Sequence, residues 1–442
     1  MTATASRPTT RRASAIPGPD GDPLLGMARA LRRDLLGTLQ AGFDRYGDVV
    51  AYRVGPARGP RRLVVAVHHP DDVRRVLTDA DTFTRDTRSY RALRELFGVN
   101  LATAGGDDWQ RQKRLLQPLF TRATAHHYAT PIEQEARAVA EHCLGAPIVD
   151  AWRTAEEYTL RVLGRTLFSD RRGIDDDTIA ALDRLVPIVA RQLTERSRQP
   201  LRMPLRWPTP KNRRFAETRE ALRATIERVL ARHAERAGDA ADLVTKLRDA
   251  RDPLGAHPLS EQEIRDQALL FLIAGHSTTS NSLCSSLYLL GRHPEIQRRI
   301  AAGGDELARA AVQEALRLRP PAYALGRKVG AAGADVGGYE LPAGTDVIVS
   351  PWVTHRHPGY WSDPERFDPW RFVGTRPSHA WLPFSVGARG CIGKHFALLE
   401  SAIFVRTLLS RCRIESLAAD YPTSQLTTMR PSRPVRIACR PR

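Results

Sequence analysis

Phe384-Ser-Val-Gly-Ala-Arg-Gly-Cys-Ile-Gly-Lys-His-Phe-Ala397 is the stretch that decides the fold. It places Cys391 in a loop with three glycines, and apolar residues follow at helical spacing. Free N–H groups and the dipole at the start of a helix favour a thiolate there. The glycines let the backbone approach a flat, bulky partner closely.

Two further side chains of this loop indicate what Cys391 could bind. Phe384 can shield the sulfur from water, and Arg389 can place a cation beside an anionic group. A thiolate with an aromatic shield and an anion-binding arginine predicts a haem iron ligand. A lone cysteine before a helix is more often a buried, inert residue, so the prediction depends on the whole pattern.

The pattern Phe-x-x-Gly-x-Arg-x-Cys-x-Gly resembles the signature of the cytochrome P450 superfamily, the haem-thiolate monooxygenases. Its fixed positions are all filled, by Phe384, Gly387, Arg389, Cys391 and Gly393. The resemblance spans nearly the whole chain. It implies haem b with Cys391 as axial ligand, in a mainly α fold with a small β-rich region. The haem is expected between a long central helix and the cysteine loop.

Length and composition bear on the number of domains, the cellular compartment and the presence of membrane spans. No linker, repeat or low-complexity block divides the 442 residues, so we expect a flexible polar segment over 1–14 and one domain over 15–442. The five cysteines show no disulfide or metal spacing, which indicates a reducing, cytoplasmic compartment. No run reaches the ~18 apolar residues of a membrane span, so we expect no membrane span. We also expect a monomer.

The net charge of +18 suggests a nucleic-acid surface at first sight. The arginines are spread along the chain, however, and no nucleic-acid-binding motif accompanies them. A basic face for an acidic electron-donor protein is the better interpretation. Its expected residues are Lys113, Arg114, Arg389 and Lys394.

A long buried helix is predicted from the capping box Ser260-Glu-Gln-Glu263 to Gly291. On it, Phe271, Ala274 and Thr278 share one face. Gly275 in mid-helix and the helix-competing threonine predict a local widening, where water or dioxygen can lodge. Without further context the segment would be read as a structural core helix.

This segment resembles the oxygen-binding motif of the family, Ala/Gly-Gly-x-acid-Thr-Thr. Ala274, Gly275, Thr278 and Thr279 match, whereas Ser277 stands in place of the acid. The resemblance assigns Thr278 to hold iron-bound oxygen and its proton-delivering water.

Trp109 and Lys113 lie four apart on one face of a predicted helix, where they suit a carboxylate. The family uses Trp-x-x-x-Arg for a haem propionate, and Lys113 replaces the arginine fork with a point charge. Arg327 is a second propionate candidate by resemblance. A packed tryptophan on a solvated helix is the alternative.

Glu314 and Arg317 are neighbours on a helix predicted over 305–318. A surface ion pair is the simplest interpretation. The resemblance implies a buried pair joined by an arginine from Pro364-Glu-Arg-Phe367, so Arg366 is the expected third member.

The remaining elements follow from local patterns. We expect a hairpin from 49–54 and 62–67, a strand over 345–353 and a C-terminal hairpin over 426–436. By resemblance, 82–106 is a mobile loop over the substrate. The residues expected to face the substrate are Phe271, Ala322, Tyr323, Ala324 and Leu325. Helices are expected over 27–46, 71–77, 130–144, 154–168 and 176–195, and residues 207–215 are expected to lead into a long helix that ends near Gly238.

The implied reaction inserts one oxygen atom into a hydrophobic molecule such as a terpenoid, polyketide or fatty acid, in secondary metabolism. The chain has no flavin or nicotinamide fingerprint, so electrons are expected from a ferredoxin and its reductase. Oxidative coupling or peroxide-driven chemistry remains an alternative because of Ser277. A non-enzymatic haem or nucleic-acid binder is supported by charge alone.

Overall fold

The computed structural model describes residues 10–167, 175–198, 203–236, 242–375 and 378–442. These residues form two compact units. The sheet unit contains residues up to 88, 322–366 and 378–391, and the helical unit contains 89–321, 367–375 and 392–442. The prediction of one domain over 15–442 remains a prediction. Residues 1–9 of the predicted flexible segment lie outside the described residues.

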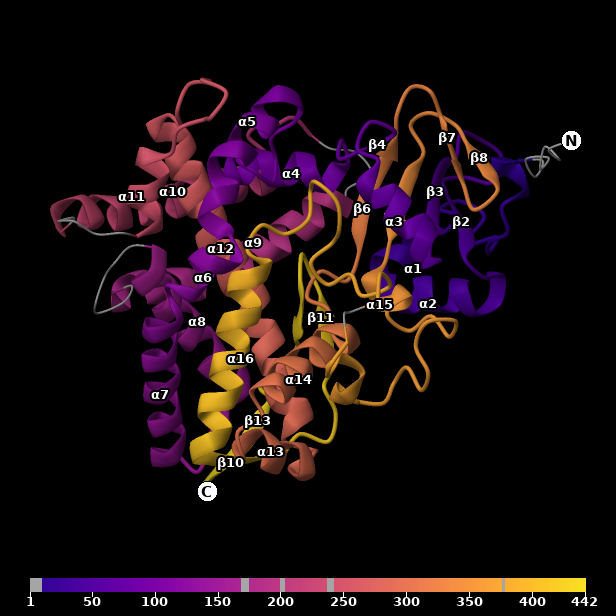
Figure 1. Ribbon diagram of the computed structural model, residues 1–442. Coiled ribbons are helices and arrows are strands. Elements are labelled where there is room, and N and C mark those ends of the chain that lie inside the picture. The colour runs from indigo at the N-terminus through magenta and orange to yellow at the C-terminus, as the bar shows by residue number, and fades with distance from the viewer. Residues whose placement is uncertain (1–9, 168–174, 199–202, 237–241, 376–377) are drawn as a thin grey trace, which may run out of the picture. The chain divides into compact units, whose positions relative to one another are not determined.

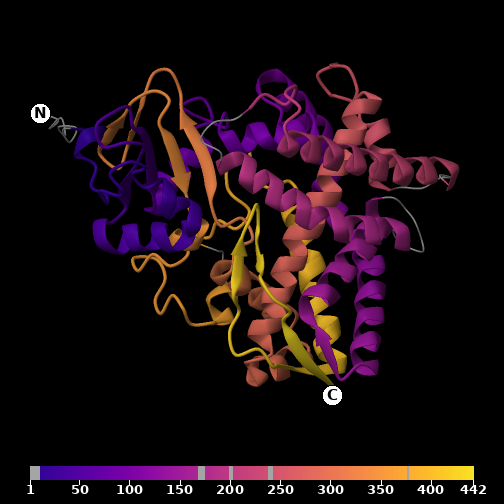
Figure 2. The ribbon, with the colours of Figure 1, turned by 180° about the vertical axis from the view of Figure 1, so that it is seen from behind.

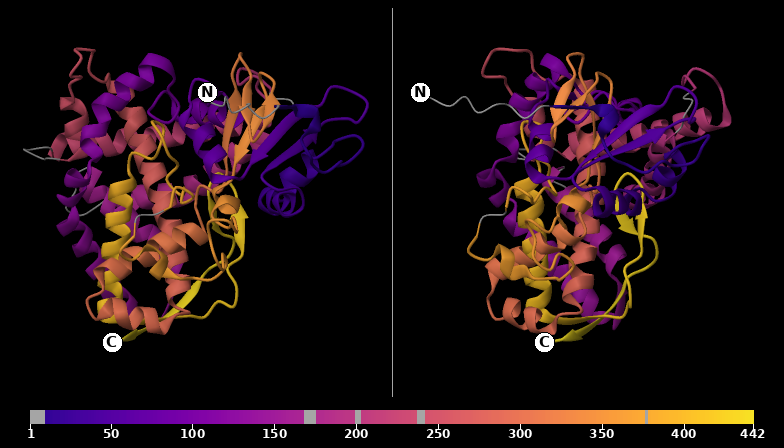
Figure 3. Two further views of the ribbon diagram at one scale, coloured as in Figure 1. Left: turned by 45° about the vertical axis from the view of Figure 1, so that its right-hand side comes forward. Right: turned by 90° about the vertical axis from the view of Figure 1, so that its right-hand side faces the viewer.

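The sheet unit is built on a five-stranded sheet that joins early and late parts of the chain. Its strand order is β2-β3-β9-β6-β4, and β3 pairs in parallel with β9. Figure 3 shows the early strands in indigo and the late strands in orange within this sheet. Valines at the strand centres form its core. The strands are β2 (Val49–Val54), β3 (Arg62–Val67), β4 (Phe83–Thr84), β6 (Leu325–Val329) and β9 (Asp346–Val349).

A second, three-stranded sheet has the order β1-β8-β7. Within the segment that was expected to be flexible, Arg11 and Arg12 pair with Tyr339 and Glu340 of β8. Its strands are β1 (Arg11–Arg12), β7 (Ala334–Val336) and β8 (Tyr339–Leu341), and the unit's helical elements are η1 (Ala13–Ala15), α1 (Ala28–Arg33), α2 (Leu35–Tyr46), α3 (Pro70–Thr78) and α15 (Pro351–Thr354).

Two predictions in the sheet unit needed correction. The helix expected over 27–46 is interrupted at Asp34, where the backbone is extended. The Asp34 side chain caps α2 by accepting the Gly37 N–H at 2.9 Å. The strand expected over 345–353 ends at Val349, and Pro351 begins α15. Proline at the first helical position explains that ending, since it lacks the N–H that a strand needs.

The helical unit is arranged around α12 (Glu261–Leu290), which packs against α8, α14 and α16. Figure 1 shows α12 and α16 running side by side. The predicted capping box is confirmed, with Ser260 and Glu263 satisfying each other's backbone N–H groups. The other helical elements are α4 (Arg88–Phe97), α5 (Gly106–Leu116), η2 (Gln117–Phe120), α6 (Arg122–His126), α7 (Ala129–Gly145), α8 (Ala151–Leu167), α9 (Asp176–Arg198), α10 (Pro210–Arg236), α11 (Leu243–Asp249), α13 (Pro294–Ala301), α14 (Asp305–Leu318), η3 (Pro369–Phe372) and α16 (Lys394–Arg411).

Short strands close this unit. β13 (Arg436–Pro441) lies between β10 (Cys412–Ser416) and β5 (Ile148–Asp150). The C-terminal hairpin exists, but it is formed by β11 (Thr423–Gln425) and β12 (Met429–Pro431), earlier than predicted. Figure 2 shows this hairpin in yellow. The stretch 82–106, expected to be a loop, contains the amphipathic helix α4.

Glu314 and Arg317 are both fully buried, as the resemblance implied. The carboxylate of Glu314 accepts bonds of 2.7 and 2.8 Å from Arg317 and one of 3.0 Å from the Asp368 N–H. Arg371 Nε lies 3.5 Å from Glu314 Oε1. The third cation is therefore Arg371, from the second Pro-x-Arg-Phe segment. Arg366 is exposed, because its turn precedes η3, which places Arg371 against α14.

We predict that Glu314→Ala destabilises the helical unit by about 3–5 kcal/mol, because it leaves buried arginine charge without its carboxylate. Urea unfolding would measure this change. Glu306→Ala is the matched control, since Glu306 lies 3.8 Å from Arg309 at the same helical spacing but is exposed. That exposed pair should contribute about 0–1 kcal/mol. Equal costs in the two variants would contradict the prediction.

Glu400 is a second buried carboxyl, on α16. Its side chain is 2 % exposed, and Oε1 has no hydrogen-bond partner among the described residues. Burial raises the pKa of Glu400 well above its ordinary value. The folded state therefore keeps this proton at pH values where the unfolded chain has released it.

The raised pKa predicts a pH effect with a definite sign. The stability that Glu400 contributes is fully present below the unfolded pKa of about 4.5 and is lost as pH rises through the folded pKa. Glu400→Gln should thus match the wild type near pH 4 and exceed its melting temperature increasingly toward pH 8. Glu141→Gln, at an exposed glutamate paired with Arg411, should show no such trend. A wild-type advantage at pH 8 would contradict the assignment.

Candidate active site

The Cys391 loop of the sheet unit is tightly constrained. The Cys391 N–H donates to the Phe384 carbonyl at 2.8 Å, and the Gly390 N–H donates to the Gly387 carbonyl at 3.0 Å. Gly387 has a φ of +76°, and a Cβ there would lie 3.0 Å from Thr78 Cα, so only glycine fits. The loop presents an exposed thiol, whereas the four other cysteines are buried.

Aromatic and cationic residues surround this loop within the sheet unit. The ring of Phe384 lies 5.9 Å from that of Trp381, and Arg85 donates to the Arg389 carbonyl at 2.8 Å. Arg327 is 2 % exposed, and its Nη1 donates to the Gly326 carbonyl at 2.9 Å. A buried guanidinium is suited to hold an anion such as a carboxylate.

The predicted substrate residues of the sheet unit precede or begin β6. Tyr323 is buried, and its carbonyl accepts the Ser350 hydroxyl at 2.9 Å. Ala322 is half-buried, as are Ala324 and Leu325. They form a short apolar stretch that is held at one point by Ser350.

The centre of α12 carries the second part of the predicted site. Ala274 is exposed although most of the helix around it is buried, and Thr278, one turn later, is half-buried on the same face. The Thr278 hydroxyl donates to the Ala274 carbonyl at 2.7 Å, and the Ser277 hydroxyl donates to the Ile273 carbonyl at 3.0 Å. Phe271 packs on Phe120 at 5.0 Å between ring centroids. The face is therefore apolar with two hydroxyls.

The local widening expected at Gly275 does not interrupt the helix, which is α-helical throughout. A Cβ at Gly275 would lie 3.2 Å from Leu163 Cδ2, so the glycine allows close packing with α8. His276 also faces α8, where Nδ1 lies 2.9 Å from the Thr159 hydroxyl. Burial lowers the pKa of His276 to about 4, so it is neutral at pH 7. This placement turns His276 away from Thr278, since the two lie about 200° apart around the helix.

Trp109 and Lys113 lie together on α5, as their spacing predicted. Lys113 Nζ is 5.3 Å from the centre of the Trp109 ring, and both residues are half-buried. Arg114 instead forms a bidentate pair with the buried carboxylate of Asp252, with bonds of 2.7 to 3.2 Å. The charge of Arg114 is therefore neutralised within the helical unit. This makes Arg114 a weak candidate for contact with an acidic partner protein.

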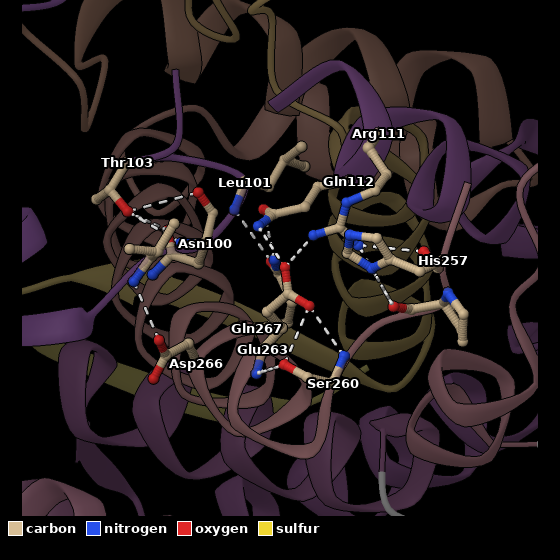
Figure 4. Close-up of polar contacts among 12 residues, drawn as sticks. Asn100, Leu101, Thr103, Arg111, Gln112, His257, Ser260, Glu263, Asp266 and Gln267 are labelled. Carbon is tan, nitrogen blue, oxygen red and sulfur yellow. Dashed lines mark hydrogen bonds and ion pairs between the residues drawn. The ribbon is translucent and has the colours of Figure 1, made fainter. Parts of the chain in front are cut away.

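The sequence analysis missed the polar anchor of residues 98–104. Figure 4 shows the backbone of this loop bonded to side chains in the first turns of α12. The Val99 N–H donates to Asp266 at 3.0 Å, and the Leu101 N–H donates to Gln267 at 3.2 Å. Gln267 in turn donates to Gln112 of α5 at 2.8 Å. Polar residues on an otherwise apolar helix were the only available signal.

Comparisons with known proteins decide the family. The family described as "Cytochrome P450" matches residues 16–438. The chain belongs to the cytochrome P450 family. Cyclooctat-9-en-7-ol 5-monooxygenase of Streptomyces melanosporofaciens is 32 % identical over 100 % of this chain and 98 % of its own. Pentalenene oxygenase of Streptomyces avermitilis is 30 % identical over 94 % and 95 %.

Solved structures agree on the P450 fold. CYP175A1 from Thermus thermophilus superimposes with a TM-score of 0.76 at 29 % identity, over 93 % of this chain and 96 % of that chain. A 6-coordinated cytochrome P450 from another strain of Thermus thermophilus gives 0.74 at 27 % identity, over 92 % and 98 %. No helix among the described residues is long and apolar enough to cross a membrane.

The P450 family implies haem held by a cysteine thiolate, and the residues of this chain fit that group. Cys391 offers an exposed thiol on a loop that its glycine and backbone bonds keep in shape. On α12, Ala274 is exposed although most of that helix is buried. In the described part of the chain no three His, Cys, Asp or Glu side chains gather to hold a metal ion. The chain is a P450 monooxygenase by its family and its relatives.

Proposed function

We propose that this P450 uses haem ligated by Cys391 to insert one oxygen atom from O2 into a hydrophobic ring compound of the terpenoid class. The observation that carries the proposal is the constrained loop that exposes only the Cys391 thiol. Phe384, Gly387, Arg389 and Gly393 are the loop residues that would support the haem. Trp109, Lys113 and Arg327 would bind its propionates.

The substrate class is supported by relatives and by side chains. Two relatives are named for cyclooctat-9-en-7-ol and for pentalenene. Phe271 and Phe120 form an aromatic pair in the helical unit, and Ala322–Leu325 is apolar except for the Tyr323 hydroxyl. Such residues bind an apolar molecule through surface burial, at about 25 cal/mol per Å².

The chemistry divides between cofactor and chain. Thiolate-bound haem supplies O–O bond cleavage when it is present. Thr278 Oγ1 would hold a water and pass a proton, and it must exchange its bond to the Ala274 carbonyl to do so. Ser277 Oγ can relay a proton but brings no charge. The small side chain of Ala274 would keep this face low enough for a substrate, while Gly275 lets the helix pack closely against α8.

We further propose that electrons come from a ferredoxin and its reductase, and that the chain works as a monomer. Lys394 at the start of α16 is exposed and remains a candidate contact for an acidic ferredoxin. Arg389 and Lys113 complete the proposed basic face. Electrostatic attraction of this kind speeds association and weakens with salt.

The ligand assignment is tested by Cys391→His and by Cys284→Ser as the matched control. The reduced carbon monoxide complex of the wild type should show the far-red-shifted Soret band of a thiolate ligand. Cys391→His should lose this band and the oxygenase activity while retaining some haem, and Cys284→Ser should keep both. An unchanged spectrum in Cys391→His would transfer the ligand role to another cysteine.

The substrate proposal is tested separately by adding cyclic terpenoid hydrocarbons and alcohols, with linear fatty acids as controls. We expect the haem absorbance to shift on binding of the cyclic compounds and an oxygenated product to form with ferredoxin, reductase and NADPH. A shift with fatty acids alone would overturn the terpenoid assignment while leaving the monooxygenase intact.

The role of the α12 hydroxyls is tested by product formed against NADPH consumed. Thr278→Ala should lower this ratio and raise peroxide release, because it removes the hydroxyl that retains the proton-delivering water. Ser277→Asp should leave the ratio unchanged or raise it, since it adds the missing charge. Unchanged coupling in Thr278→Ala would favour the alternative, oxidative coupling or peroxide-driven oxidation.

A further inference from the structure

The sheet formed by β10, β13 and β5 carries two arginines directly opposite each other. Cys412 and Cys439 are buried on its inner face. Because successive side chains along a strand alternate between the two faces, Arg413 and Arg440 lie on the outer face, and both are exposed. The register of β10 and β13 places Arg413 opposite Arg440. Like charges at opposed positions repel each other, so this pair weakens the sheet instead of stabilising it.

Two further arginines extend the same positive face along β13. Arg436 and Arg442 are separated from Arg440 by an even number of positions, so they share its face, and both are exposed. Carboxylates on this face are fewer. In the described part of the sheet they are Asp150, opposite Arg436, and Glu415, which lies 3.8 Å from Arg440.

Arginines beside this face are paired with acids, whereas two arginines on it are not. Arg406 lies 3.4 Å from the carboxylates of both Glu133 and Asp305, in a cavity of about 440 Å³. By contrast, no ion pair among the described residues includes Arg413 or Arg442. The charge of the outer face is therefore available to an anionic partner.

The edge of β10 is closed to a partner strand. The Ile414 N–H donates to the Gln297 side chain at 3.1 Å, and the Ser416 N–H donates to the Gly291 carbonyl at 3.1 Å. These bonds use the backbone donors that a strand added at this edge would need. A partner must therefore lie across the outer face and be held by side chains.

We propose that the outer face of this sheet binds an acidic protein segment in an extended conformation, with carboxylates at alternate positions. Guanidinium groups bind carboxylates through two parallel N–H donors. Arg440 and Arg442 are two residues apart, which separates them by about 7 Å along a strand. An extended partner segment presents every second side chain at the same spacing, so its carboxylates match the arginines.

Two features favour a protein segment over a nucleic acid or a lipid surface. The carboxylates of Asp150 and Glu415 interrupt the positive face, and they would repel a continuous layer of phosphates. Ile148 of β5 lies on this face opposite Ala438 and is 54 % exposed. Its side chain can pack on the uncharged side chains that separate the carboxylates of a peptide.

The binding test uses the full-length, haem-loaded protein and a fluorescent peptide of alternating glutamate and threonine. Fluorescence anisotropy should show saturable binding that weakens as salt is added. A peptide of the same composition with its glutamates in one block should bind several-fold more weakly, because its carboxylates do not match the arginine spacing. Equal binding of the two peptides, or binding of neither, would overturn the proposal.

Arg413→Gln combined with Arg440→Gln should weaken binding of the alternating peptide by about tenfold, because it removes the opposed charges of the face. Arg137→Gln combined with Arg406→Gln is the matched control. It removes the same charge from the neighbouring cavity, where both arginines are paired with Glu133, and should leave binding unchanged. Similar losses in the two variants would show attraction to net charge alone and would overturn the assignment to this face.

A stability measurement distinguishes a binding face from a structural one. Arg413→Gln should raise the melting temperature at low salt, because it removes the repulsion from Arg440, and the gain should shrink at high salt. A lower melting temperature at low salt would show that the opposed arginines support the fold, and it would count against a face kept for binding.

Two competing probes test the kind of partner. A single-stranded thymidine oligonucleotide and vesicles of phosphatidylglycerol present phosphates instead of carboxylates. Each should bind more weakly than the alternating peptide, and Arg413→Gln with Arg440→Gln should change their binding little. Tighter binding of either probe through these arginines would overturn the assignment to a protein segment. None of these measurements needs turnover, so their outcome is independent of the proposed monooxygenase function.

Discussion

A buried carboxylate, Glu314, constrains much of the helical unit. A charge without water must have its hydrogen bonds met by the protein, and here Arg317 and the Asp368 N–H supply them while Arg371 adds charge. Because Asp368 and Arg371 come from η3 and the turn before it, the ion pair fixes that segment against α14. The chain continues from there toward the cysteine loop. The buried ion pair therefore holds the segment that precedes the loop of Cys391, the proposed haem ligand.

The central helix faces a different constraint, since it must carry polar groups through a buried interior. It does so by internal bonding. Ser277, Thr278, Ser285 and Ser286 each donate to the carbonyl four residues earlier. Such bonds meet the hydroxyl's need for a partner at little cost to the helix. Ala274, one turn before Thr278, is exposed, whereas the same position on an ordinary core helix would be covered.

Features that depend on neighbouring residues could be predicted from the sequence, whereas contacts between residues far apart in the chain could not. The capping box at Ser260, the extent of α14 and the adjacency of Glu314 and Arg317 depend on neighbouring residues and were predicted correctly, whereas the burial of that pair was implied only by the family resemblance. The choice between Arg366 and Arg371 could not be made, because both lie in Pro-x-Arg-Phe segments. Only burial beside α14 separates them. For the same reason the pairing of Arg114 with Asp252 was missed, since 138 positions separate the two residues.

Ser277 stands where the family has an acid, and its effect on proton delivery near Thr278 is expected to be small. His276 cannot replace the charge, because it faces α8 and is neutral at pH 7. Under the proposed function, protons would then move through neutral donors, the two hydroxyls and any water they hold. Each hydroxyl must first release its helix carbonyl, which costs about 1 kcal/mol for a typical hydrogen bond. A cost of that size slows proton delivery by less than about tenfold. Serine at this position is thus compatible with the proposed oxygen insertion, and under that proposal the retention of water by Thr278 controls coupling.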